Sequence, residues 1–407
     1  MLQIIKLVKT PLLSLFVFVL GNGLFTTLLV MRMHDEGVSS LYVGSMTSAY
    51  YLGLVIGSFQ IEKLILRVGH IRVYAASASA LAVICLLHGI FFNLPFWLLL
   101  RLLGGYATAS LFVVIESWLL VAGSIKMRGQ ILSLYMIAFY AAQAFGQLLV
   151  NLGTTKNLLL FAVAAMLSSL SVIPLSMTKA LQPEISEPSV LSFKKLYQVA
   201  ASGMIGCATS GLILSAIYGL LPLFIIIRSD STARVSAFMA AVIFGGMALQ
   251  YPLGRLSDHI ERRTVLIGIT GGIIIMSMLA MITFKDAWTS FVVMFLFGGM
   301  TFTLYPICIS HACDSLETQD IVSGTQGMLL AYSIGSTVGP LIAPIFIKYL
   351  GINGLFIYFI ISSALLMVFF IWRRLSHTAP VQEEPFRLMA QTSPISAELD
   401  PRGEEGE

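Results

Sequence analysis

Charged residues are scarce in this chain. Asp, Glu, Lys and Arg together supply 11% of its 407 residues, whereas soluble domains contain roughly 25%. Apolar residues make up 57% of the chain, and the mean hydropathy is +0.90. This composition excludes an ordinary soluble domain and predicts a polytopic membrane protein embedded in a lipid bilayer.

Cysteine is also rare, with four residues in the chain. No CxxC pair occurs, and all four cysteines fall in or beside apolar spans, so we expect small buried cysteines and neither a metal nor a cofactor. A phosphate-binding P-loop is missing, which argues against ATP-driven transport by this chain. No nucleophile–base set has a recognisable spacing, so we expect no enzyme, and nothing indicates a nucleic-acid partner.

Twelve apolar stretches are long enough to cross a bilayer, which takes roughly 20 helical residues. The absence of alternating polar and apolar residues argues against a membrane barrel. The first stretch resembles a signal peptide, but no small-residue cleavage site closes it well, so we interpret it as a retained helix. The expected spans are 11–31, 41–61, 73–92, 95–122, 129–151, 158–177, 197–227, 234–254, 264–284, 288–312, 321–347 and 352–372.

The distribution of basic residues predicts the orientation in the membrane. With twelve spans, the side that holds both termini carries 17 of the 24 Lys and Arg residues, and the other side carries 6. Basic residues collect on the cytoplasmic side. We therefore expect a multi-pass protein of the bacterial inner membrane with both termini in the cytoplasm.

Internal similarity divides the chain into two halves. LLGGYATA at 102–109 aligns with LFGGMTFT at 296–303, and GQLL at 146–149 aligns with GPLI at 339–342. The two offsets are nearly equal, as expected for two six-helix units facing the same way, with a binding site between them near the bilayer midplane.

A polar stretch between the sixth and seventh spans marks the boundary between these units. The predicted organisation is an N-terminal six-helix bundle over 1–180, a cytoplasmic linker over 181–196, a C-terminal six-helix bundle over 197–374 and a tail over 375–407. The tail is polar and rich in acidic residues, and we expect it to be disordered, with no assigned function.

The fourth span carries two charges in an apolar stretch. Arg101 and Glu116 share a broad helix face with Thr108, and they lie about 22 Å apart along the axis, too far to pair. Charges inside a membrane usually face a protein interior or a water-filled path. Glu116 is a candidate for proton coupling or a carboxylate bonded near the cytoplasmic end, and Arg101 could bind an anionic substrate or bond to helix ends.

Polar residues on other spans extend this expected cavity. Hydrogen-bonding side chains on one stripe of a span are unlikely to face lipid, and they could bind a polar cargo or bond to neighbouring helices. His311 is a second proton candidate, because histidine titrates near neutral pH, although a histidine near a helix end is more often structural. The further cavity candidates are Asn22, Tyr140, Gln143, Gln147, Tyr218 and Tyr305.

The stretch GRLSDHIERR at 254–263 resembles the loop signature Gly-x-Leu-x-Asp-Arg-x-Gly-Arg-Arg of the major facilitator superfamily. Gly254, Asp258, Arg262 and Arg263 match this signature, and the corresponding loop of the first half keeps Arg67. VVIESWLL, YGLLPLF and YSIGSTVGP resemble the YcaD-type bacterial branch of the superfamily. The resemblance implies an all-α fold of twelve transmembrane helices in two six-helix pseudo-repeats and transport by alternating access.

The resemblance also implies that these loop residues gate the cytoplasmic side. Asp258 could form charge-assisted hydrogen bonds with Arg262 and Arg263 and meet neighbouring helix ends. The alternative is a topology signal with solvated charges.

Together these observations predict a secondary active transporter that moves a small polar or amphiphilic solute, with proton coupling as the expected driving force. An uncoupled facilitator and a non-transporting receptor or assembly subunit with the same fold are the alternatives. The sequence names neither the substrate nor the direction of transport.

Overall fold

A computed structural model describes residues 2–122, 127–177, 192–376, 382 and 385–404. Its first half contains α1 Leu2–Asp35, α2 Ser40–Val68, α3 His70–Ile90, α4 Leu94–Val121, α5 Arg128–Leu148, η2 Leu149–Leu152, α6 Leu158–Leu170 and α7 Val172–Ser176. Its second half contains α8 Phe193–Ser229, α9 Thr232–His259, α10 Arg262–Ile282, η3 Thr283–Lys285, α11 Ala287–Cys313, η4 Thr318–Asp320, α12 Ile321–Leu350 and α13 Gly354–Ser376. Two short 3-10 helices follow in the tail, η5 Pro394–Ala397 and η6 Pro401–Glu404.

Twelve helical segments in the described part of the chain are long and apolar enough to cross a membrane. α6 and α7 together form one of them, Leu158–Ser176. The all-α fold with twelve transmembrane helices is thereby confirmed. Residues 181–191 of the expected linker lie outside the described residues, and α8 already begins at Phe193.

The same local chemistry starts α4 and α11, which occupy equivalent places in the two halves. The Asn93 side chain accepts a hydrogen bond from the Phe96 backbone N–H at 3.0 Å, and Asp286 accepts one from the Thr289 N–H at 2.9 Å. Side chains of this type satisfy backbone donors that a helix leaves free at its start. The two caps are spaced like the aligned sequence repeats, so the repeat extends to the helix starts.

Glycine pairs let helices cross closely within each half. A Cβ added to Gly105 of α4 would contact the backbone oxygen of Tyr50 in α2, and one added to Gly298 of α11 would contact the backbone oxygen of Val242 in α9. Small residues at such crossings allow backbones to approach. Each half therefore closes its own bundle with the same device.

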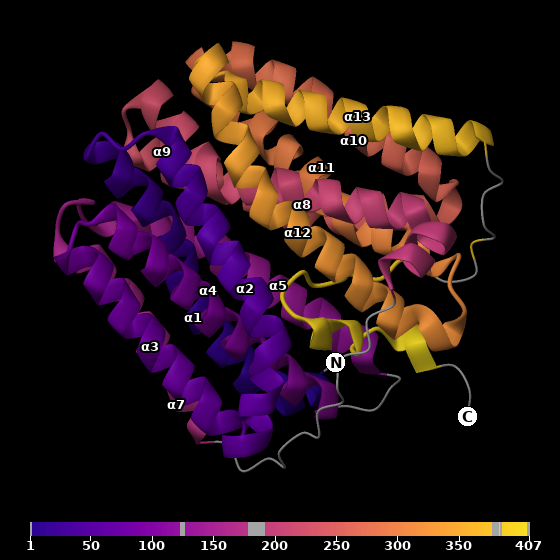
Figure 1. Ribbon diagram of the computed structural model, residues 1–407, viewed down its shortest axis with the longest axis horizontal. Coiled ribbons are helices and arrows are strands. Elements are labelled where there is room, and N and C mark those ends of the chain that lie inside the picture. The colour runs from indigo at the N-terminus through magenta and orange to yellow at the C-terminus, as the bar shows by residue number, and fades with distance from the viewer. Residues whose placement is uncertain (1, 123–126, 178–191, 377–381, 383–384, 405–407) are drawn as a thin grey trace.

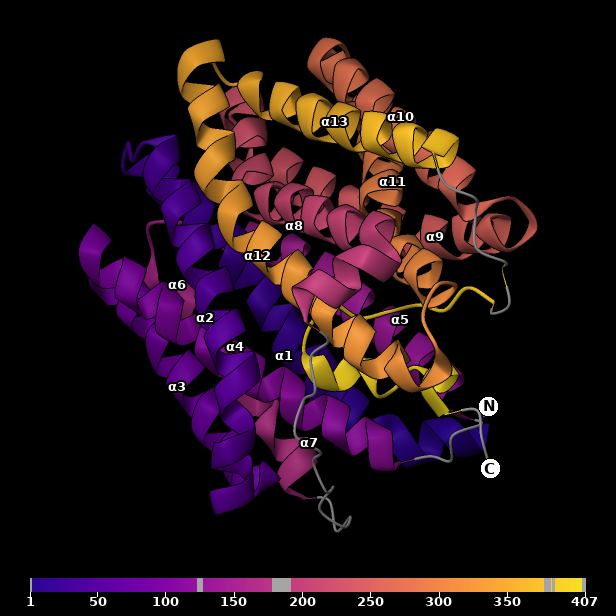
Figure 2. The same ribbon diagram turned by 45° about the vertical axis from the view of Figure 1, so that its right-hand side comes forward.

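The two halves lie beside each other and meet mainly through α2 with α12, α5 with α9, and α1 with α8 (Figures 1 and 2). We call the end of the bundle where α1 begins and α13 stops the terminal end, and the other end the far end. At the far end, Gly44 packs against Pro340, and the Asn151 Nδ2 donates to Ser236 Oγ at 2.7 Å. The halves are therefore in direct contact at the far end.

Between the halves at the terminal end lies the tail segment 385–404 (yellow in Figures 1 and 2). Disorder is the expectation from the sequence, but this segment packs against the helices and buries Met389, Ala390, Ile395 and Leu399. Its burial of apolar side chains gives a physical reason for the difference. The expectation for 377–381, 383–384 and 405–407 lies outside the described residues.

Candidate functional site

A cavity of about 90 Å³ lies between the two halves. Most of its wall belongs to the first half, a smaller part belongs to the second half, and the tail closes one side. The lining residues are Asn22, Thr26, Thr47, Tyr50, Tyr51, Leu54, Arg101, Phe112, Met136, Phe139, Tyr140, Gln143, Tyr218, Phe302, Tyr332, Ala390, Gln391 and Thr392. A site lined by aromatic rings with a few polar groups is typical of small-molecule binding.

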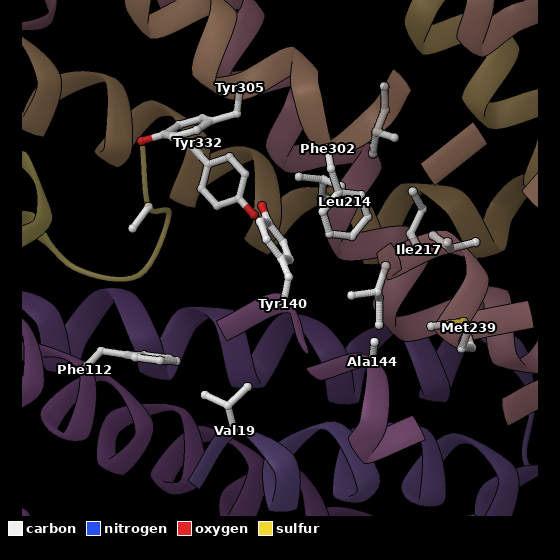
Figure 3. Packing of buried hydrophobic residues seen from close by; sticks show 14 of the residues in the cluster. Val19, Phe112, Tyr140, Ala144, Leu214, Ile217, Met239, Phe302, Tyr305 and Tyr332 are labelled. Atoms are coloured by element: carbon white, nitrogen blue, oxygen red, sulfur yellow. The ribbon is translucent and has the colours of Figure 1, made fainter. Parts of the chain in front are cut away.

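Aromatic side chains join the two halves across this cavity (Figure 3). The Tyr140 ring of α5 lies edge-on to Phe302 of α11, with centroids 5.6 Å apart, and the Tyr218 ring of α8 contacts the same Phe302 at 5.8 Å. The Tyr140 hydroxyl accepts a hydrogen bond from Gln250 Nε2 of α9 at 3.0 Å. Tyr140 is therefore both a wall of the cavity and a polar link between the halves.

Arg101 lines the cavity from α4 and is 5% exposed. Its guanidinium carbon lies 4.2 Å from the centroid of the Tyr50 ring, a cation–π arrangement. Within the described part of the chain, no carboxylate forms an ion pair with Arg101. The cavity therefore contains a cation without an acidic partner from the described residues.

Glu116 lies about four turns further along α4 and is fully buried. Its Oε1 accepts hydrogen bonds from the Tyr135 hydroxyl of α5, at 2.6 Å, and from the Thr392 hydroxyl of the tail. Its Oε2 accepts a hydrogen bond from the Ser393 hydroxyl. Three hydroxyl groups thus hold the carboxylate, and two of them come from the tail.

Five of the predicted cavity residues line the cavity, namely Asn22, Arg101, Tyr140, Gln143 and Tyr218. The structure places Thr108, Gln147 and Tyr305 elsewhere. Thr108 is fully buried one turn after Gly105, where α4 packs closely on α2.

Gln147 and Tyr305 serve helix packing. The Gln147 side chain accepts a hydrogen bond from Thr27 Oγ1 at 2.5 Å and donates to the Gly23 backbone oxygen at 3.2 Å, so it links α5 to α1. The Tyr305 ring packs behind Tyr332, with centroids 5.0 Å apart, and Tyr332 is the one that reaches the cavity (Figure 3). Neither residue is among those that line the cavity.

The second proton candidate, His311, lies away from the cavity. It is 4% exposed near the end of α11, where its Nε2 accepts a hydrogen bond from Arg263 Nε at 3.4 Å. The Arg263 Nη1 donates to the Arg373 backbone oxygen at 3.3 Å. His311 therefore belongs to the contacts among α10, α11 and α13 at the terminal end.

The predicted gating loop forms a buried ion network at the terminal end. Arg262 donates to Asp314 Oδ1 at 2.6 Å, to Asp258 Oδ1 at 3.3 Å and to the Ser310 backbone oxygen at 2.6 Å. Burial raises the pKa of Asp314 to about 7, although Arg262 and Arg402 lower it. The network joins α9 and α10 to the end of α11.

The tail covers this loop. The Asp258 carboxylate accepts a hydrogen bond from the Phe386 backbone N–H at 2.7 Å, and the Phe386 ring lies over Gly254. Arg67, the matching residue in the first half, is exposed at the end of α2. The two loops that resemble each other in sequence therefore differ in their surroundings.

Several cavity residues are not among those predicted from the sequence. Tyr50 and Tyr51 form an adjacent pair near the middle of α2, and Tyr332 lies in α12. The signal available was their aromatic character inside long apolar spans, but aromatic residues are common there. Thr392 and Ser393 gave no signal, because nothing in a polar tail indicates that it enters a cavity.

Comparison with known proteins gives consistent results. Residues 12–331 match the family model described as the Major Facilitator Superfamily. The chain is 31% identical over 373 residues to the MFS-type transporter YcaD of Escherichia coli O17:K52:H18 (strain UMN026 / ExPEC). The aligned residues cover 90% of this chain and 95% of YcaD.

Solved structures share the fold at low sequence identity. A single-residue mutant of the nucleoside transporter NupG superposes with a TM-score of 0.76 at 15% identity, over 90% of this chain and 99% of NupG. A mutant of the E. coli fucose:proton symporter FucP superposes with a TM-score of 0.55 at 13% identity, over 92% of this chain and 100% of FucP.

Proposed function

This chain belongs to the major facilitator superfamily, and from that premise we propose that it is a secondary active transporter of a small polar or amphiphilic solute. The observation that carries the proposal is the cavity between the two six-helix halves, lined from both of them. A solute bound there would be passed across the membrane by rocking of one half against the other around a fixed site.

The closed far end and the tail-filled terminal end support alternating access. The contacts of Gly44 with Pro340 and of Asn151 with Ser236 seal the far end. The excess of basic residues at the terminal end supports a cytoplasmic position for both termini. In this orientation the structure is closed toward the outside, in a bacterial inner membrane.

Glu116 is the proposed coupling group. Its carboxylate is fully buried and accepts hydrogen bonds from the hydroxyls of Tyr135, Thr392 and Ser393. A hydroxyl can serve as donor or acceptor, so these partners can hold the carboxyl group in either protonation state. FucP, a fucose:proton symporter, is an example of this fold coupled to protons.

The ion network around Arg262 is the proposed cytoplasmic gate. It ties the ends of α9, α10 and α11 together through Asp258 and Asp314. Such an arrangement can break and re-form when packed elements move between two discrete positions. His311 is a weaker candidate than Glu116 for the proton-coupling group, because it contacts Arg263 and does not line the cavity.

The test is proton flux in sealed vesicles that contain the purified protein and a trapped pH indicator. Solutes from several chemical classes are added outside under an imposed proton gradient, and the internal pH is recorded. Wild-type protein should move protons with one class, and Glu116→Gln should abolish that flux while retaining solute exchange at equal pH.

An exposed acid offers a matched control, because Asp286→Asn changes a carboxylate at the far end, outside the cavity. Solute uptake that is identical in wild type and Glu116→Gln at every pH gradient would identify an uncoupled facilitator. Absence of any solute movement by folded wild-type protein, and also by folded protein whose tail contacts Thr392 and Ser393 are replaced by alanine, would favour a receptor or an assembly subunit.

A further inference from the structure

Arg101 is a buried cation that the described structure leaves without an acid. The titratable groups near it are the hydroxyls of Tyr50 and Tyr51, the thiol of Cys85 and the imidazole of His88, and none of these carries a negative charge at neutral pH. Arginine stays protonated inside proteins. A buried charge without an ionic partner destabilises the folded state.

The position of Arg101 suggests what offsets that cost. Its side chain lines the main cavity and also a smaller void bounded by Thr26, Thr47 and Trp97. A ligand in the cavity can therefore reach the guanidinium directly. A guanidinium binds a carboxylate with two parallel hydrogen bonds, which neutral ligands cannot match.

We infer that the transported solute is a small organic monoanion, a carboxylate attached to an apolar or aromatic body. Among the described residues, Arg101 is the one charged side chain in the cavity lining, so it balances a single negative charge. Tyr50, Phe112 and Phe302 provide an apolar wall for the body of the solute. This inference rests on the proposed transport function and specifies its substrate class.

Binding measurements with matched ligand pairs test this inference. Phenylacetate and its neutral amide phenylacetamide differ only in the carboxylate, and a set of aliphatic monocarboxylates with their amides covers other body shapes. Calorimetry on the purified full-length protein should detect at least one carboxylate, with its amide bound at least about thirtyfold more weakly.

Substitutions at Arg101 separate charge from packing. Arg101→Gln should abolish the preference for the carboxylate, Arg101→Lys should restore part of it, and Lys156→Gln, which removes an exposed cation in a loop at the far end, should leave it unchanged. Equal binding of acid and amide, or an intact preference in Arg101→Gln, would overturn the inference. Proton-coupled movement of a neutral solute would also overturn it, while leaving the transport function in place.

A second and independent inference concerns the tail segment 385–404. Its contacts extend to both halves: Gln326 Nε2 of α12 donates to the Pro394 backbone oxygen at 3.4 Å, and Arg128 Nη1 of α5 donates to the Glu398 backbone oxygen at 3.0 Å. Arg402 is buried in an ion pair with Asp400 at 2.6 Å. The tail is therefore fixed to the two bodies that alternating access must move apart.

The tail also occupies space that a solute needs. Ala390, Gln391 and Thr392 form part of the cavity wall, and about 90 Å³ remains beside them. Pockets for drug-sized ligands measure roughly 300–1,000 Å³. Gln391 and Thr392 also line a second, smaller void together with Ser58 of α2 and Gln326 of α12.

We propose that segment 385–404 is an autoinhibitory plug that closes the cavity on the side of the chain termini and must leave before a solute binds from that side. The plug holds Glu116 through the hydroxyls of Thr392 and Ser393. Its withdrawal would free the same carboxylate that the proposed coupling mechanism uses. A transported solute and the plug then cannot occupy the cavity at the same time.

Full-length variants with weakened plug contacts test this proposal. Thr392→Ala with Ser393→Ala removes two hydrogen bonds to Glu116, and Ala390→Asp places a charge at a position that is 1% exposed. The readout is the rate at which a membrane-impermeant maleimide, added from the side of the termini, labels Leu54→Cys in the cavity wall. The four native cysteines are buried, and wild-type protein labelled in parallel gives their background.

Both plug variants should raise the labelling rate at least about fivefold and should raise solute uptake. Gln382→Ala, which alters a tail contact with Ile260 outside the cavity, is the matched control and should change neither rate. Labelling at the wild-type rate in folded double-alanine protein would overturn the proposal. Faster labelling with loss of uptake would also overturn it, because the tail would then be part of the transport machinery.

Discussion

The two halves share one architecture but hold their charged groups in different places. In the first half, Arg101 and Glu116 lie inside the membrane on α4, and the loop residue Arg67 is exposed. In the second half, α11 has no charge within its span, and the buried ion pairs gather at the terminal end around Arg262. This difference agrees with our proposal that the first half supplies the charged groups of the cavity and the second half supplies the cytoplasmic gate.

The largest expected effect tests this division at the two matching loops. Arg262→Ala removes the ion-pair partner of the buried Asp314 carboxylate, which should cost about 3–5 kcal/mol of stability. Arg67→Ala changes an exposed residue and should stay within about 0.5 kcal/mol. Thermal unfolding of the two purified variants measures the difference, and equal losses would contradict the division.

Glycine substitutions test whether the helices pack equally closely in the two halves, although the halves place their charged groups differently. Gly105→Leu and Gly298→Leu each push a side chain against a backbone oxygen of the neighbouring helix, so each should cost about 1–3 kcal/mol. The yield of monodisperse protein in size-exclusion chromatography reports the loss. Gly268→Ala, where an added Cβ meets nothing within 4 Å, is the control. A large loss in only one half would break the equivalence.

A smaller effect is expected where the halves meet at the far end. Asn151→Ala removes the hydrogen bond to Ser236, so it should weaken far-end closure by about 1 kcal/mol. Distances between spin labels on the far-end loops of the two halves should then show a larger open population. An unchanged distance distribution would mean that apolar contacts such as Phe145 with Phe244 close this end without help.

A pH dependence of stability is expected in the second half. The folded-state pKa of Asp314 is raised to about 7, whereas an unfolded aspartate titrates near 3.9. Between these values the folded state holds the extra proton, so the free energy of unfolding should decrease as pH rises from about 4 to about 7. Asp314→Asn should flatten the thermal stability profile in this window, and a slope that persists in the variant would assign the effect to other groups.

Much of the fold follows from sequence because its determinants are local. Length and hydropathy define twelve spans, and the caps at Asn93 and Asp286 repeat at the spacing of the aligned motifs. For the cavity, the sequence predicted which faces of the helices line it, but not how far along each helix the cavity extends. Tyr140, Gln143 and Gln147 share one stripe of α5, but the cavity ends before Gln147, and no periodicity encodes that depth.

The partners of Glu116 could not be predicted, because they depend on tertiary placement. Thr392 and Ser393 follow it by more than 270 residues, in a segment whose buried residues show no regular spacing. A polar composition predicts disorder when a segment has nothing to pack against. Here the opening between two helical bundles supplies the missing surface.

The location of the tail has a practical consequence for the handling of this protein. Purification tags and fluorescent reporters are commonly fused after the last residues of a chain, and Asp400 and Arg402 of the tail are buried. A bulky fusion at this point would hinder the packing of segment 385–404 between the two halves. If the plug proposal holds, such a fusion would activate the transporter instead of leaving its activity unchanged. Functional screens therefore need the tag on the opposite terminus or in the loop between the two halves.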